Sequence, residues 1–115
     1  MILVNKEAIT KQVVDAWYDE WETLREKIHE AHTLRDGSAH ELMAQGIELF
    51  EQFLVKYSKT DEPFSQDSDY ELMPINGMER FQFIKMRPGQ YACYRQLDEL
   101  YKETKKRCAR LRLVK

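Results

Sequence analysis

Apolar residues recur every three or four positions through most of this chain, a spacing that places them on one face of an α-helix. The few glycines and prolines fall mainly between these periodic stretches. Trp17 and Trp21 both lie on the apolar face of the first stretch, which makes them core candidates. The pattern therefore predicts an all-α fold. The apolar positions of the first stretch are Ile9, Val13, Trp17, Trp21, Leu24, Ile28 and Ala31.

The periodic stretches predict three long helices and one short helix in a single domain over residues 1–115. A chain of 115 residues, 43% of them hydrophobic, can build one core. A first helix over residues 5–34 would be roughly 42 Å long, which exceeds the diameter of a compact globule of this size. We therefore expect an elongated up-down helical bundle. Its helices are expected at about 5–34, 38–57, 76–86 and 88–113.

Several residues mark the expected helix starts and contacts. Asn5 and Asn76 are expected to cap the first and third helices, and Ser38 is expected to open a capping box for the second. Pro88 suits the first turn of the last helix, because that turn leaves its amide groups unpaired in any case. Gly46 indicates either a weak point in the second helix or the close approach of another helix.

The stretch 58–75 loses the helical period and is expected to be a long acidic connection. Pro63 and Pro74 interrupt it, and five acidic residues outnumber the single Lys59. Some of its apolar residues are expected to pack onto the bundle. An alternative for the chain ends is a small strand pairing between residues 2–4 and 111–113.

Motifs for catalysis are scarce, and the sequence favours a protein that is not an enzyme, with no cofactor. The glycines are scattered singly, so neither a phosphate-binding loop nor a nucleophile elbow is present. Cys93 and Cys108 are too far apart on one helix to form a disulfide, and we expect buried, reduced thiols. His29 and His32 are weak candidates for metal ligands, since the other helices offer no inward Glu-x-x-His motif.

Positive charge is concentrated at the end of the chain. Residues 102–115 contain seven basic residues and one acidic residue, a local net charge of +6, whereas the other 101 residues carry −8. This basic helix could bind phosphates or an acidic partner. Part of the pattern has a local explanation, because Asp98 and Lys102, and likewise Glu103 and Arg107, are an acid and a base four residues apart. The residues expected to line the face opposite the apolar stripe are Arg95, Lys102, Lys106 and Arg110.

One segment and several residues after it carry a family resemblance. They are Met73 to Ile84, Arg87-Pro88, Tyr91, Tyr94, Gln96-Leu97, Leu100 and Glu103 to Lys106. Together they resemble the C-terminal signature of the YpoC-like family. The resemblance implies a cytosolic helical protein of Gram-positive bacteria, from a family with no established biochemical activity. Within this segment Arg80 and Arg87 are cations whose partners the sequence does not identify. They could form a structural clamp with an acid of the 61–71 region, or an anion or acidic-peptide pocket.

Together these features predict a non-catalytic interaction or accessory protein that binds another protein in the cytoplasm. No stretch approaches the length of apolar sequence that a membrane helix needs, and the apolar start is too short for a signal peptide. The chain is expected to be a monomer or a homodimer. The alternative is a nucleic-acid-associated factor that uses the basic C-terminal helix.

Overall fold

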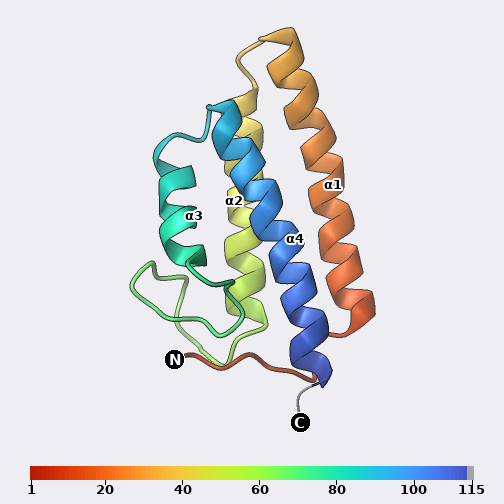
Figure 1. Cartoon of the computed structure of the whole chain (residues 1–115), viewed down its shortest axis with the longest axis vertical. Helices are drawn as coiled ribbons and strands as arrows, with labels where there is room; N and C mark the ends of the chain where they lie inside the picture. The colour runs from red at the N-terminus through yellow and green to blue at the C-terminus, as the bar shows by residue number, and fades with distance from the viewer. Residues whose placement is uncertain (114–115) are drawn as a thin grey trace.

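A computed structural model describes residues 1–113 and contains four helices that run alternately up and down (Figure 1). The all-α prediction is confirmed, with three long helices and one short helix. Residues 114 and 115, and with them the predicted cation Lys115, lie outside the described part. The helices are α1 (Lys11–Leu34), α2 (Ala39–Lys56), α3 (Gly77–Met86) and α4 (Tyr91–Leu113).

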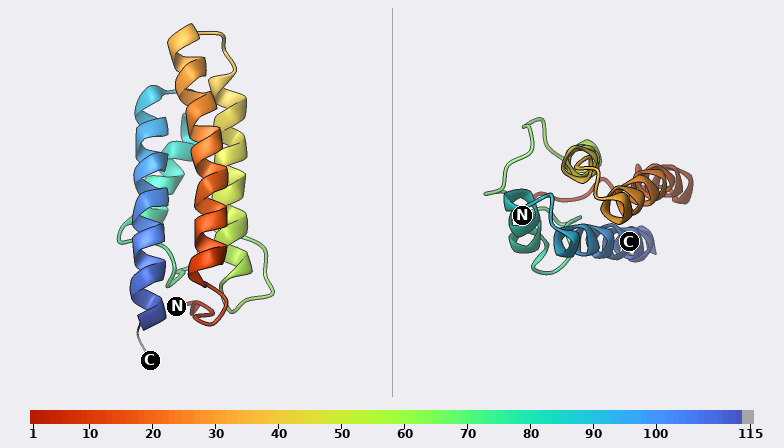
Figure 2. Two further views of the ribbon diagram at one scale, coloured as in Figure 1. Left: turned by 90° about the vertical axis from the view of Figure 1, so that its right-hand side faces the viewer. Right: turned by 90° about the horizontal axis from the view of Figure 1, so that it is seen from above.

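The molecule is elongated, as predicted, with extents of 47 × 29 × 22 Å. The helix α1 packs against both α2 and α4, while the short α3 lies against α4 on the side away from α1 (Figure 2). No helix within residues 1–113 is both long and apolar enough to span a bilayer.

Stacked aromatic rings form the centre of the core. The rings of Trp21 and Tyr101 lie 4.2 Å apart at an angle of 5°, which joins α1 to α4. Trp17 stacks on Phe53 of α2 at 3.9 Å and on Tyr101 at 4.7 Å. Both tryptophans are buried, so their predicted place in the core is confirmed. Stacked aromatic pairs stabilise a core beyond the apolar area that they bury.

Gly46 marks a close approach between helices rather than a weak point. A Cβ atom at this position would lie 2.7 Å from Cζ3 of Trp21 and 3.3 Å from a methyl carbon of Leu97. The backbone carbonyl of Gly46 also accepts a hydrogen bond of 2.6 Å from the Tyr101 hydroxyl. The missing side chain therefore lets α1 and α4 pack directly on the α2 backbone.

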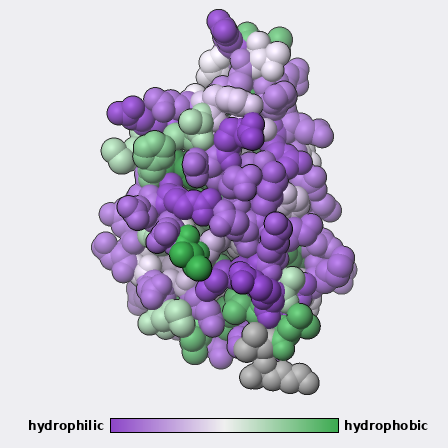
Figure 3. Space-filling model, in the orientation of Figure 1, coloured by the Kyte–Doolittle hydropathy of each residue, from purple (hydrophilic) through white to green (hydrophobic). Residues whose placement is uncertain are grey.

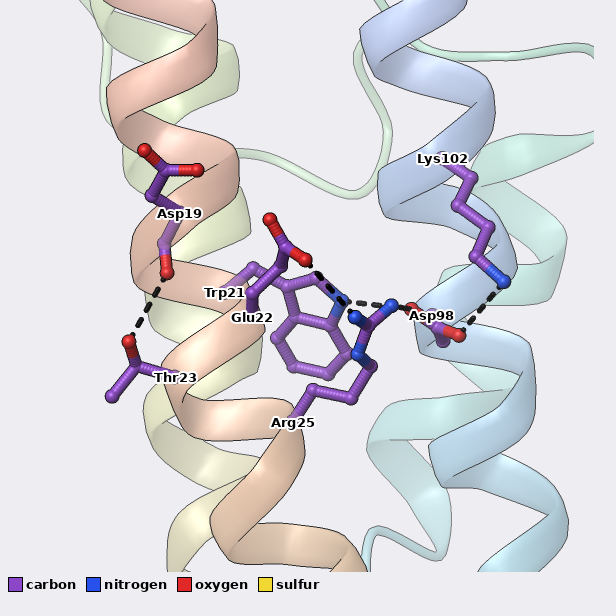
Figure 4. A network of polar contacts seen from close by, with 7 residues as sticks. All are labelled: Asp19, Trp21, Glu22, Thr23, Arg25, Asp98 and Lys102. Carbon is purple, nitrogen blue, oxygen red and sulfur yellow. Dashed lines mark hydrogen bonds and ion pairs between the residues drawn. The ribbon is translucent and has the colours of Figure 1, made fainter.

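A buried carboxylate, Asp98, holds α4 to α1 (Figure 4). Its Oδ1 accepts hydrogen bonds from Nε1 of Trp21 at 3.0 Å and from Nη1 of Arg25 at 3.2 Å, and its Oδ2 lies 3.1 Å from Nζ of Lys102. Burial alone would raise the pKa of Asp98, but the hydrogen bonds from Trp21, Lys102 and Arg25 outweigh it, and the pKa is lowered. The carboxylate is therefore charged and fully partnered at neutral pH.

The prediction that the first helix begins near Asn5 is wrong, because α1 begins at Lys11. Thr10 is its N-cap, and the Thr10 hydroxyl accepts a hydrogen bond of 3.2 Å from the amide of Val13. Ile9 is fully buried although it precedes the helix, so it fits the apolar spacing without being helical. An N-cap threonine in extended geometry stops the helix from continuing toward the N-terminus.

Residues 2–4 instead form an extended strap that joins both ends of the 58–75 connection. Ile2 bridges to Tyr70, and Val4 bridges to Ser58. The amide of Ile2 donates to the carbonyl of Asp69 at 2.7 Å. The alternative pairing with residues 111–113 is wrong, because those residues stay helical in α4. Figure 1 shows the strap passing beneath the lower ends of the helices.

Ser38 and Asn76 stand at the N-cap positions of α2 and α3, as expected, but neither side chain makes the expected capping hydrogen bond. Ser38 has helical backbone angles, and its hydroxyl donates to Oδ1 of Asp36 at 2.6 Å. Asn76 adopts left-handed geometry with φ of 56°, so its side chain does not cap α3. In both cases the preceding turn determines the backbone angles of the residue, and these angles determine where its side chain lies.

The last helix begins at Tyr91 rather than at residue 88. Pro88 and Gly89 form a turn between α3 and α4, closed by a hydrogen bond of 3.1 Å from the amide of Gln90 to the carbonyl of Arg87. Arg87 has the extended φ of −142°, as the residue before a proline prefers. The proline therefore separates the two helices instead of starting the second.

Candidate functional site

Many cations of the basic C-terminal segment hold the fold together and are not free to bind a ligand. Lys102 pairs with Asp98 and lies 3.7 Å from Glu99. The side chains of Arg107 and Arg112 donate to backbone carbonyls, at 2.6 Å to that of Glu71 and at 3.0 Å to that of Ile9. These contacts fasten α4 to Ile9, just before α1, and to the 58–75 connection, so a sequence count overstates the number of cations that are free at the surface.

Arg80 forms a clamp with Glu103 across α3 and α4. Its two terminal nitrogens contact the two carboxylate oxygens at 3.1 and 2.6 Å, which is the bidentate geometry of a strong arginine–carboxylate pair. The hydrogen bond with Glu103 raises the pKa of Arg80. The predicted clamp is present, but its acid comes from α4 and not from residues 61–71. Its consequence is that Arg80 offsets the charge of Glu103.

Beside this clamp lies a hollow of about 300 Å³, which we call the Ile75 hollow. Ile75 is 79% exposed, and among the exposed large apolar side chains of residues 1–113 it is the one that lines this hollow. Lys106 and Arg110 are exposed, lie one turn apart on α4, and make no hydrogen bond or ion pair with any residue from 1 to 113. The hollow is lined by Pro74, Ile75, Glu103, Lys106, Arg107 and Arg110.

The six predicted anion-binding or partner-binding residues do not form one site. Lys106 and Arg110 meet at the Ile75 hollow, whereas Lys102 is occupied by Asp98, and Arg80 acts on the hollow through Glu103. Arg87 and Arg95 are exposed near the other end of α4. Arg95 is separated from Lys106 by eleven residues, or roughly 16 Å along the helix.

The predicted metal candidates do not converge on one point. His29 is exposed, while the ring of His32 packs against Tyr91 at 5.3 Å and Tyr94 at 5.9 Å. Among residues 1–113, no group of three or more histidine, cysteine or acidic side chains is placed to hold a metal ion. Packing against the two tyrosines therefore accounts for the position of the His32 ring, while His29 lies at the surface of a small hollow that His32, Thr33 and Tyr91 also line.

Both cysteines are buried and free, as expected. Burial raises the pKa of the Cys108 thiol to about 12 and also raises that of Cys93. Thiols with raised pKa values carry little thiolate at neutral pH, and the thiolate is the reactive form. We therefore assign both cysteines to packing.

Sequence reasoning missed Ile75 and Arg107 as members of the site. Ile75 lies between Pro74 and Asn76, outside any helical period, and an apolar residue isolated in a turn was the one available signal. The spacing predicts a pair between Arg107 and Glu103. In the structure Glu103 contacts Arg80 instead, and Arg107 donates to the carbonyl of Glu71 in the connection. Only the packing of α3 on α4 decides between these pairings.

Comparison with known proteins agrees with the resemblance seen in the C-terminal half. The family model described as YpoC-like protein matches residues 11–115, from the first residue of α1 to the end of the chain. A protein of Bacillus subtilis (strain 168), described as "Uncharacterized protein YpoC", is 49% identical over 41 residues. That stretch covers 36% of this chain and 25% of the relative. No solved structure gives a significant match.

Proposed function

This chain belongs to the YpoC-like family. We propose that it is a non-catalytic protein that binds another protein through the Ile75 hollow. The matched relative is itself uncharacterised, so the proposal depends on the geometry of this chain. We place the interaction in the bacterial cytoplasm, a reducing compartment in which the free thiols of Cys93 and Cys108 would be stable.

The observation that carries the proposal is the pair of exposed cations, Lys106 and Arg110, which have no acceptor among residues 1–113. Their neighbours Lys102, Arg107 and Arg112 are each held by an internal acceptor, so these two are the cations left facing solvent at the hollow. Exposed charges at the rim of an interface attract an oppositely charged partner and raise its rate of association. An acidic surface on another protein would be complementary in charge to Lys106 and Arg110.

Two features favour a protein over a nucleic acid as the partner. The residues outside 102–115 carry a net charge of −8, which repels a polyanion that extends beyond the hollow. The hollow is lined by aliphatic and charged residues, without the aromatic platform on which single-stranded bases stack. A nucleic-acid role, which the +6 charge of residues 102–115 favours, is the second candidate, and the experiment below separates the two.

The double variant Lys106→Gln/Arg110→Gln is expected to weaken binding of an acidic peptide about tenfold. Each rim charge contributes about 0.5–1 kcal/mol to such an interaction, and the two act on the same ligand. Fluorescence anisotropy would compare a labelled glutamate-rich peptide with a single-stranded oligonucleotide of equal charge at the same ionic strength. Lys27→Gln/Lys59→Gln is the matched control, because it removes two exposed cations that lie outside the hollow.

Three results are informative. Peptide binding that weakens in the hollow variant and persists in the control supports the proposal. Tighter binding of the oligonucleotide, lost in the hollow variant, supports the nucleic-acid candidate and contradicts the protein-binding one. Equal affinities for the hollow and control variants show that the Ile75 hollow has no part in binding.

A further inference from the structure

We infer that the partner segment bound at the Ile75 hollow presents an apolar side chain flanked by acidic ones. This inference rests on the proposed function, because it specifies the chemistry of the ligand at the same site. It follows from the combination of one exposed apolar residue with surrounding cations, and neither feature alone would lead to it.

Ile75 is held outward by a rigid turn. The amide of Gly77 donates to the carbonyl of Pro74 at 2.8 Å, which closes the turn around Ile75. Gly77 packs so tightly that an added Cβ would lie 2.6 Å from the side chain of Met73. Met73 and Pro74 are buried, so the residues before Ile75 are fixed in the bundle. A fixed apolar side chain loses little conformational entropy when a partner covers it.

The cations around Ile75 are positioned to face an acidic ligand. Arg107 is anchored by its hydrogen bond to the Glu71 carbonyl, which places it on the wall of the hollow. Lys106 and Arg110 supply exposed positive charge that no acid within residues 1–113 neutralises, and the methylene groups of such side chains add apolar surface beneath that charge. Glu103 is the one acid that lines the hollow, and the bidentate contact with Arg80 offsets its repulsion of an anionic ligand.

The hollow therefore joins an apolar part, Pro74 and Ile75, to a charged part from α4, and protein interfaces likewise combine apolar and charged surface. A hollow of about 300 Å³ lies at the lower end of the range for binding pockets, which suits one inserted side chain better than a broad surface. The face in Figure 3 is mainly hydrophilic, with small, separate hydrophobic areas. A short segment with one apolar anchor therefore fits better than a large apolar partner.

The test uses two labelled peptides of equal charge, Glu-Glu-Leu-Glu-Glu and Glu-Glu-Ser-Glu-Glu. The unmodified chain is expected to bind the leucine peptide about fivefold more tightly, because the leucine covers Ile75. In the Ile75→Ser variant this preference is expected to disappear, while the affinity for the serine peptide stays the same. The matched control is Met86→Ser, because Met86 is 77% exposed and does not line the hollow.

The outcomes separate this inference from the proposed function. Equal affinity of the unmodified chain for both peptides would overturn the apolar anchor and leave acidic binding intact. A leucine preference that survives in Ile75→Ser would place the anchor elsewhere and also overturn the inference. Failure of both peptides to bind would overturn the proposed function itself. Thermal melts of both variants, expected to match the unmodified chain, confirm that neither substitution alters the fold.

Discussion

Replacing Gly46 with valine is expected to destabilise the fold by about 3 kcal/mol, as overpacking of a core does in its severe cases. The first added carbon would lie 2.7 Å from the ring of Trp21, well inside van der Waals contact. That ring is fully buried and stacked at 4.2 Å on Tyr101, so it has no free space to move into. The small gain in helix propensity over glycine, less than about 1 kcal/mol, does not offset this clash.

Urea unfolding followed by circular dichroism would measure the loss. Gly89→Ala is the matched control, because a Cβ at Gly89 would lie 3.8 Å from the nearest carbon of His40, an ordinary contact. We expect that variant to change the free energy of unfolding by less than about 0.5 kcal/mol. A Gly46→Val protein less than 1 kcal/mol weaker than the original would show that α2 does not approach α1 and α4 as closely as described.

The helices were predictable because the residues that the apolar spacing places on one helix face are the same residues that pack in the core. Trp17 and Trp21 lie on a stripe that a 3.6-residue period defines, and the core uses that stripe. The break before Pro88 follows from the local restriction that proline puts on Arg87, although the last helix begins at Tyr91 and not at residue 88 as expected. Where the local backbone preference and the tertiary packing agree, the sequence alone is sufficient to predict the secondary structure.

The start of α1 shows where this agreement fails. Ile9 satisfies the spacing of the first helix, yet it is not helical: residues 2–4 are extended and pair with residues 58 and 70, and residues 6–8 form a turn. A period of apolar residues specifies which side chains are buried, but an extended segment can bury the same side chain. The strap depends on contacts with residues more than fifty positions away, which no local pattern records.

The candidate site was predicted only in part. Lys106 and Arg110 were expected on a basic face and are exposed at the hollow, whereas Ile75 and Arg107 were not expected there. The sequence offered Asp98 as the local partner of Lys102 at the surface, whereas the structure buries Asp98 between α1 and α4. Which acids neutralise which bases is decided by helices meeting in three dimensions, and that determines which charges stay available to a partner.

Replacing Asp98 with alanine is expected to destabilise the protein by about 3 kcal/mol, a typical cost when a buried hydrogen-bonded charge loses its partner. The indole N–H of Trp21 would be left buried without its acceptor, and Arg25 and Lys102 would lose a shared partner. Arg25 and Lys102 are partly exposed, so water compensates part of their loss and Trp21 accounts for most of the effect. Asp98→Asn keeps an acceptor for Trp21 and is expected to lose about half as much.

The asparagine variant also separates the charge of Asp98 from its hydrogen bonds through pH. The folded-state pKa of Asp98 is lowered from the ordinary value of 3.8, so the charge contributes stability that is present above about pH 4. That contribution is lost as the pH falls through the folded pKa. The difference in unfolding free energy between the original chain and Asp98→Asn should therefore be constant from pH 7 to 5 and shrink below pH 4.

Asp15 and Asp36 also have lowered pKa values, but both are present in the two proteins and cancel in this difference. A difference independent of pH down to pH 2.5 would contradict a stabilising charge at Asp98, and urea titrations at each pH would measure it.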